Sequence, residues 1–135
     1  MANLASTYGN QGRWEEAEKL GVRVMETRKA KLGTDHPDTL NSMANLASTY
    51  GNQGRWEEAE KLEVRVMETR KAKLGADHPD TLNSMANLAF TWKYQGRHAD
   101  ALVLMSSCVQ ALHRVLGPEH PHTQSCVATL DEWST

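Results

Sequence analysis

Apolar residues recur along the chain at the three- and four-residue spacing of an amphipathic helix. One such stripe lies between residues 37 and 52 and comprises Leu40, Met43, Leu46, Ala47 and Tyr50. A second stripe lies between residues 56 and 74 and comprises Ala59, Leu62 and Val66. No segment alternates apolar and polar residues with the period of two that marks a strand. The pattern therefore predicts an all-α chain.

The residues at the ends of these segments indicate where each helix begins and ends. Pro37 suits the first position of a helix, and Asp38 places a negative charge at the positive end of the helix dipole. Gly54 marks a turn between two helices, and Gly75 supplies the left-handed conformation that ends the second. We therefore expect helices over residues 37–52 and 56–74, joined as an antiparallel hairpin.

The pattern repeats with a period of 42 residues. Residues 1–42 and 43–84 differ only at positions 21/63 and 34/76, and residues 85–126 match the second unit at 16 of 42 positions. Residues 127–135 begin a fourth unit. A lone hairpin cannot bury its apolar face, so neighbouring units must stack. We therefore expect a single array over residues 1–135, a solenoid of about seven helices.

Small and aromatic residues recur at fixed places in each unit, in the pattern Leu46-Ala47-x-x-Tyr50-x-x-x-Gly54-x-Trp56-x-x-Ala59. This pattern resembles the tetratricopeptide signature, although the third unit has Trp92 and His98 where the second has Tyr50 and Trp56. The resemblance implies a right-handed superhelical tetratricopeptide solenoid of antiparallel helix hairpins. The 42-residue unit exceeds the usual repeat of roughly 34 residues. It is similar to kinesin light chain repeats and, more closely, to the near-identical arrays of fungal NLR-like receptors.

The charge balance and the apolar pattern limit the classes of partner. The formal net charge is −2, from 15 Lys and Arg against 17 Asp and Glu, so the chain has no basic surplus for nucleic acid or an anionic membrane. No apolar run approaches the ~20 residues that span a bilayer, and the first residues lack the pattern of a secretory signal. The two cysteines, Cys108 and Cys126, are expected to be free thiols in a reducing compartment. We expect a soluble, cytoplasmic protein.

Polar side chains lie opposite the apolar stripe in the first helix of each unit. These positions are Asn3, Asn41, Asn45, Ser48, Asn52, Asn83 and Asn87. Amides donate and accept hydrogen bonds, so stacked rows of them could satisfy the main chain of an extended peptide. The resemblance to kinesin light chain implies the same, because matching asparagines there contact cargo peptides. We expect a protein-interaction module with a peptide-binding groove; the alternative, solvated helix positions without a ligand, stays open.

The third unit changes the expected groove by placing Phe90, Lys93 and Tyr94 where the second has Ser48, Gly51 and Asn52. An apolar or aromatic residue of a peptide is expected near Phe90 and Tyr94. An acidic residue is expected near Lys93 or Arg97. The alternative is that these side chains cap the array against its last helix.

The second helix of the third unit is apolar nearly all round, which is normal for a buried helix. Five residues replace charged ones of the second unit: Leu102, Val103, Met105, Leu112 and Val115. One interpretation is self-association, as an end-to-end or helix-exchanged homo-oligomer. The other is that residues 127–135, with Leu130 and Trp133, cover this helix. A structural scaffold that self-associates is therefore the alternative function.

No catalytic motif or cofactor-binding loop is present in the sequence, so we expect neither an enzyme nor a cofactor. The three histidines that precede proline are expected to mark helix starts, with their rings packed on the adjoining hairpin: His36, His78 and His120. His120, His122 and Cys126 supply three potential ligands, one fewer than a closed zinc site requires, so no metal is expected. Cys108 replaces Val66 and is expected to be a small buried hydrophobe.

Overall fold

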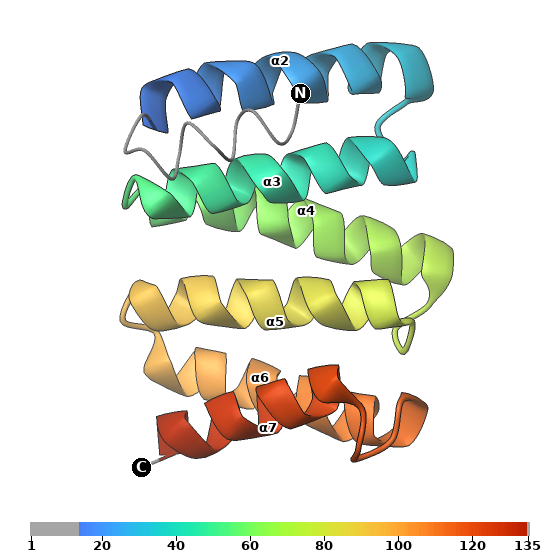
Figure 1. The fold of residues 1–135 in the computed structure, drawn as a ribbon, viewed down its shortest axis with the longest axis vertical. Helices are drawn as coiled ribbons and strands as arrows, with labels where there is room; N and C mark the ends of the chain where they lie inside the picture. Colours follow the sequence, from blue (N-terminus) through green and yellow to red (C-terminus); the bar gives the residue numbers. More distant parts are fainter. Residues whose placement is uncertain (1–13, 135) are drawn as a thin grey trace. The chain divides into compact units, whose positions relative to one another are not determined.

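The computed structural model describes residues 14–134, and within that range the chain is a series of helices without a strand (Figure 1). The helices are α2 (Trp14–Leu32), α3 (Pro37–Asn52), α4 (Trp56–Leu74), α5 (Pro79–Tyr94), α6 (His98–Val115) and α7 (Pro121–Ser134). The helices predicted over residues 37–52 and 56–74 are confirmed at both ends. Gly54 and Gly75 have positive φ values of 77° and 102°, so the predicted turn and the predicted helix stop are also confirmed.

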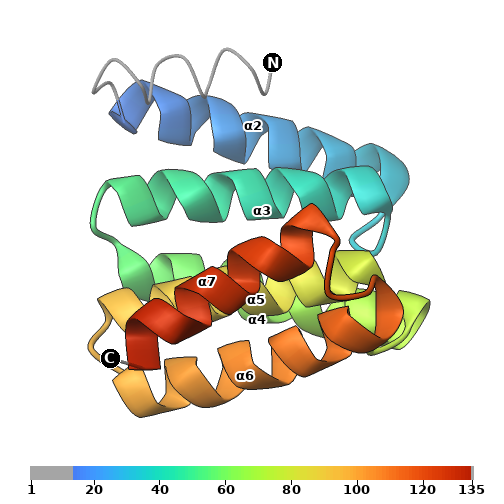
Figure 2. The ribbon, with the colours of Figure 1, turned by 60° about the horizontal axis from the view of Figure 1, so that its bottom comes forward.

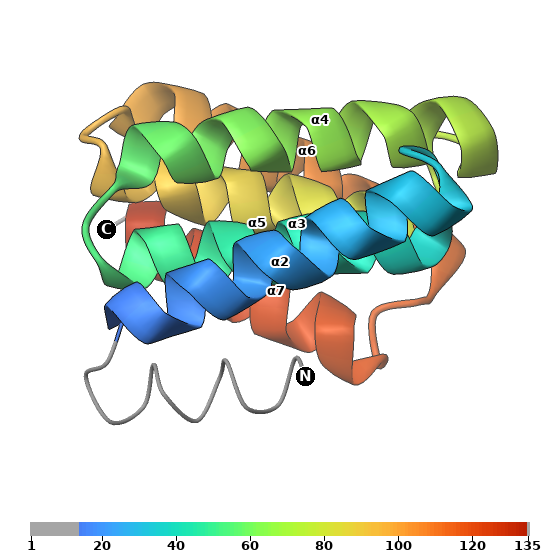
Figure 3. The same cartoon turned by 90° about the horizontal axis from the view of Figure 1, so that it is seen from above.

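The chain divides into two compact structural units, residues 1–66 and 67–135, which differ from the 42-residue repeats of the sequence; the division falls inside α4. Below, 'unit' means one of these two, and the sequence repeats are called repeats. In the first unit, α2 and α3 are antiparallel neighbours (Figures 1 and 3). In the second unit, α6 packs against α5 and against α7 (Figure 2). Each unit therefore has helices from more than one repeat in contact. The single array over residues 1–135 stays a prediction.

Histidine rings cap the first helix of successive repeats. Nδ1 of His36, His78 and His120 accepts a hydrogen bond from the backbone N–H two residues later, at 3.0–3.1 Å. The first N–H groups of a helix have no partner within the helix, so this bond satisfies one of them. Each helix then begins with the proline that follows the histidine. The histidines mark helix starts as expected, and the structure adds the capping role of the ring.

A buried arginine joins the long helix of one repeat to the first helix of the next. Nη1 of Arg70 in α4 donates to Ser84 Oγ at 2.8 Å and to the Asp80 carbonyl oxygen at 3.3 Å. Only 8% of Arg70 is exposed, and this burial lowers the pKa of its guanidinium from the usual value. In the first unit, Arg28 makes the same bond to Ser42 Oγ at 2.8 Å. This arginine–serine contact is therefore a repeated element of the fold.

The third repeat has an apolar contact at the same place. Leu112 and Cys126 stand where the second repeat has Arg70 and Ser84. Leu112 is fully buried and Cys126 is 5% exposed, and both belong to one core with Met105. Two apolar groups in contact leave no buried donor without a partner, so the substitutions are compatible with each other.

This core corrects part of the expected self-association surface. Met105 and Leu112 are fully buried within their own unit, so these two of the five expected residues are not part of an exposed self-association surface on α6. The reason is that α7 covers this side of α6, and Leu130 and Trp133 of α7 pack against the core. The alternative interpretation, in which residues 127–135 cover the helix, describes this side correctly.

The signature residues allow close packing inside the repeats. Ala47 and Ala59 are each only 1% exposed. A Cβ atom on Gly51 would lie 2.7 Å from Cζ3 of Trp56, so the indole ring needs a glycine at that position. The third repeat has Lys93 and His98 at these two places, and His98 is exposed. The two changes belong together, because loss of the indole ring makes room for a side chain at position 93.

We expect Arg70→Ala to lower the free energy of unfolding by about 1–3 kcal/mol, because Ser84 Oγ and the Asp80 carbonyl oxygen lose a buried donor. Arg70→Leu combined with Ser84→Cys restores the pair that the third repeat uses and should recover most of this loss. Urea denaturation followed by circular dichroism, in the presence of a reductant, measures both. A double variant no more stable than Arg70→Ala would show that the two contacts are not equivalent.

Candidate peptide-binding surface

Helices α3 and α5 both expose polar side chains on the side away from their buried residues. The exposed positions are Asn41, Asn45, Ser48 and Asn52 on α3, and Asn83 and Asn87 on α5. Their spacing alternates with buried residues of the same helices, which is why the apolar period of the sequence located them. The rows are therefore open to solvent. Their alignment from repeat to repeat stays a prediction, and Asn3 lies outside the described residues.

An aromatic contact joins α5 to α7 in the second unit. The ring centroids of Phe90 and Trp133 are 5.2 Å apart, and the rings meet edge to face at 82°, a favourable arrangement for an aromatic pair. Nζ of Lys93 lies 5.6 Å from the centroid of the Trp133 ring, within the range of a cation–π contact. Both side chains thus contact the last helix, as the capping interpretation expects. Phe90 nevertheless remains 39% exposed, so part of its ring is open to solvent.

Tyr94 and Arg97 have different surroundings at the end of α5. Tyr94 is 65% exposed, which makes it a highly accessible aromatic side chain. The guanidinium carbon of Arg97 lies 4.5 Å from the centroid of the Trp92 ring, and its Nε donates to Asp100 Oδ2 at 3.1 Å. Arg97 therefore already has an acidic partner within the chain, and Lys93 is the better placed of the two to meet an acidic residue of a ligand.

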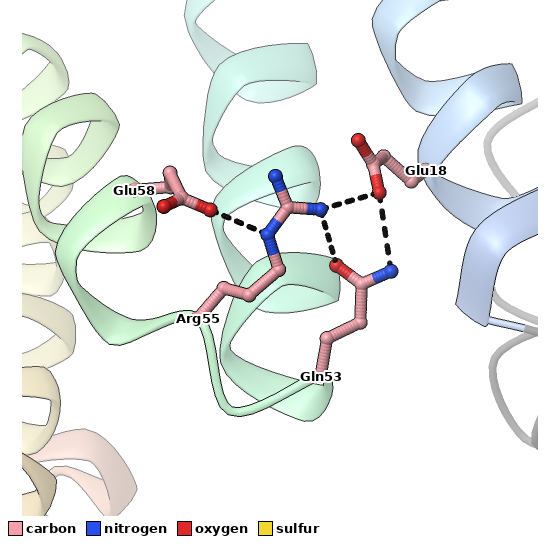
Figure 4. Close-up of polar contacts among 4 residues, drawn as sticks. All are labelled: Glu18, Gln53, Arg55 and Glu58. Atoms are coloured by element: carbon pink, nitrogen blue, oxygen red, sulfur yellow. Dashed lines mark hydrogen bonds and ion pairs between the residues drawn. The ribbon is translucent and has the colours of Figure 1, made fainter.

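A similar arginine in the first unit is the centre of a polar network (Figure 4). Nη1 of Arg55 binds Glu18 Oε1 at 2.6 Å and Gln53 Oε1 at 3.2 Å, and its Nε pairs with Glu58. Its guanidinium carbon lies 4.6 Å from the centroid of the Tyr50 ring. Burial and the nearby Glu18 raise the pKa of Tyr50.

This network was not predicted from the sequence, although the recurrence of arginine one residue before Trp56 or His98 was a usable signal. In both described repeats the arginine stacks on the aromatic residue two positions before the end of the first helix and pairs with an acidic residue three positions after itself. Because the arginine side chains are about two-fifths exposed, each ion pair contributes little to stability. Their effect is to hold the turn between the helices.

The groups considered for a metal site are engaged in other contacts. Nδ1 of His120 accepts a capping hydrogen bond, and Cys126 is buried between α6 and α7. Within residues 14–134, no group of three or more His, Cys, Asp or Glu side chains could hold a metal ion. None of the helices in this range is long and apolar enough to cross a membrane.

The Tetratricopeptide repeat family model matches residues 1–72 and again residues 45–112. Among solved structures, a Podosopora anserina protein described as kinesin light chain with nearly identical TPR-like repeats has a TM-score of 0.89 and 28% identity, over 98% of this chain and 63% of its own. A point variant of that protein matches equally well, over 62% of its own chain. No curated protein matches the chain.

A more distant structure, BtubC from P. vanneervenii, has a TM-score of 0.80 at 16% identity, over 97% of this chain and 54% of its own, and supports the fold alone. The chain thus spans less than two thirds of the solved structures that it resembles. The predicted fold class, an all-α tetratricopeptide solenoid with repeats like those of kinesin light chain, is confirmed. The chain belongs to the tetratricopeptide repeat family.

Proposed function

We propose that this chain is a protein-interaction module that binds an extended peptide segment on the polar faces of the first helices of its repeats. The observation that carries the proposal is the exposure of asparagine at matching positions of two repeats, Asn41 and Asn45 on α3 and Asn83 and Asn87 on α5. Tetratricopeptide repeats generally serve as protein–protein interaction modules, which supports the same conclusion.

The chemistry of these faces suits a peptide main chain. A side-chain amide offers two donors and one acceptor, so it can bind the backbone of a peptide whatever its sequence. Selectivity then comes from neighbouring side chains that contact the peptide's own side chains. On α5, Tyr94 and the exposed part of Phe90 offer an apolar contact, and Lys93 offers a positive charge. We therefore propose a ligand with an apolar or aromatic residue next to an acidic one.

The remaining parts of the proposal concern the class of protein. Repeats of this kind are typically non-enzymatic scaffolds, and we propose the same role here, without a cofactor and in the cytoplasm. The nearly balanced charge, with a formal net charge of −2, supports a protein partner rather than nucleic acid or an anionic membrane. We also propose, from the similarity of its repeats, that the chain is related to fungal NLR-like receptors.

Asn45→Ala combined with Asn87→Ala should weaken binding of a selected peptide by roughly tenfold or more, because each amide lost removes hydrogen bonds to the peptide backbone. Peptides selected from a library on the wild-type chain, then titrated by fluorescence anisotropy, provide the measurement. Gln110→Ala is the matched control, because Gln110 is an exposed amide on α6. Equal affinities for the wild type and the double variant would remove these amides from the mechanism.

Tyr94→Ala should weaken binding of peptides that carry an aromatic or apolar anchor, and it should leave the unfolding midpoint unchanged because the side chain is 65% exposed. Tyr94→Phe keeps the ring and should retain most of the affinity. A comparison of the two variants on the same peptide separates the ring from the hydroxyl group. If both variants bind as the wild type does, Tyr94 is not part of the peptide contact.

A self-associating scaffold is the second candidate, and the exposed part of α6 favours it. Val103 and Val115 are 68% and 40% exposed, and Leu102 is half-buried. We expect Val103→Lys combined with Val115→Lys, which restores Lys61 and Lys73 of the second repeat, to lower the average mass in light scattering at high concentration. A monomer mass for the wild type under the same conditions would eliminate this candidate.

A further inference from the structure

The two cysteines of the chain come from different helices and lie in one buried core. Cys108 of α6 is fully buried and Cys126 of α7 is 5% exposed. The thiol of Cys108 donates to the Leu82 carbonyl oxygen at 3.2 Å. The two side chains lie in the same cluster of buried residues, close enough for each thiol to shift the pKa of the other. The two thiols therefore meet where α7 packs on α6.

The contact makes the two thiols unequal. The contact with Cys108 lowers the pKa of Cys126, whereas the same contact, together with burial, raises the pKa of Cys108. Only the thiolate is a nucleophile. Cys126 also keeps a small exposed fraction, whereas Cys108 is fully buried, so we expect Cys126 to react first with an oxidant and Cys108 to react with it afterwards.

The second repeat has other residues at the matching places. The second repeat has Val66 where the third has Cys108, and Ser84 where the third has Cys126. Both repeats thus place small side chains at these two positions, and only the third repeat has thiols at both. The cysteines add one property that those residues lack, the ability to form a covalent bond between α6 and α7.

We propose that Cys108 and Cys126 form a reversible disulfide that cross-links α7 to α6 under oxidising conditions. The oxidant is a small-molecule disulfide such as oxidised glutathione. The Cys126 thiolate attacks one sulfur of the oxidant, whose S–S bond breaks, and one glutathione leaves as a thiolate that takes up a proton. The Cys108 thiolate then attacks the sulfur of Cys126 in this mixed disulfide and releases the second glutathione. Two protein thiols are oxidised, and one oxidant molecule is reduced to two thiols.

The reaction requires α7 to separate transiently from α6, because both thiols are buried in the closed state. Local opening of a single helix costs less free energy than global unfolding. Once formed, the disulfide closes a loop between α6 and α7 and restricts this opening. It also keeps Trp133 beside Phe90, since Trp133 belongs to α7. The inference concerns the α6–α7 contact and does not depend on the proposed peptide binding.

The test is titration of the reduced chain with oxidised glutathione, followed by intact mass spectrometry and hydrogen exchange. We expect a product two hydrogens lighter than the reduced chain, monomeric and without a glutathione adduct. Amide exchange across α7 should slow on the order of tenfold or more in this product, and dithiothreitol should reverse the change. A chain that stays reduced, or that retains glutathione on both cysteines, would overturn the proposal.

Two variants taken from the second repeat serve as controls. Cys108→Val should accumulate a mixed disulfide at Cys126, because no second thiol can displace the glutathione. Cys126→Ser should react much more slowly, because Cys108 is fully buried. Faster modification of Cys126→Ser than of Cys108→Val would reverse the assigned order of attack. An internal disulfide in the wild type that leaves α7 exchange unchanged would show that it does not hold the helix.

Discussion

The contact between the long helix of one repeat and the first helix of the next is the constraint on which the rest of the structure depends. At this contact a side chain leaves water, and a buried polar group must find a partner or be replaced by an apolar one. Arg28 and Arg70 meet the requirement with hydrogen bonds to a serine hydroxyl. In the third repeat, Leu112 replaces the arginine, so no polar group is buried at that position. Both solutions keep two helices in contact, although their chemistry is opposite.

Because this contact is apolar in the third repeat, α7 packs on the preceding helix without the arginine–serine bond that α3 and α5 have. Helix α7 lies on Met105 and Leu112 of α6, and it reaches α5 through the contact between Trp133 and Phe90. Phe90 is the aromatic residue of α5 that contacts α7, and Lys93 lies against the same Trp133 ring. The surface that a ligand would contact on α5 therefore depends on the packing of α7. The two thiols lie in the same contact between α6 and α7.

The two sides of each first helix serve different purposes. The choice of residues on the buried side is limited by packing, since Ala47, Ala89 and their neighbours lie in the core. Residues on the exposed side contribute little to packing, so asparagine, serine, phenylalanine or tyrosine can occupy these positions in the same kind of helix. This separation is the physical reason why one repeat scaffold can present different surfaces.

The sequence by itself determined the helices, the repeat and the family. Proline and glycine at fixed places set the helix ends because they act on the local backbone, and the apolar period located the exposed asparagines because it reports which side of a helix is buried. Periodicity does not say which neighbour covers that side. Periodicity is therefore compatible both with self-association through Met105 and Leu112 and with cover by residues 127–135, and it allows either a ligand groove or a terminal cap for Phe90 and Lys93.

Only the tertiary structure decided which residues from different helices meet. The arginine–serine contact, the histidine caps and the Cys108–Cys126 pair each depend on where a side chain ends in space. No local rule relates Arg70 to Ser84, because the two residues come together through the packing of two helices. Helix boundaries follow from interactions within a few residues of the chain, whereas contacts between helices follow from the packing of the whole core.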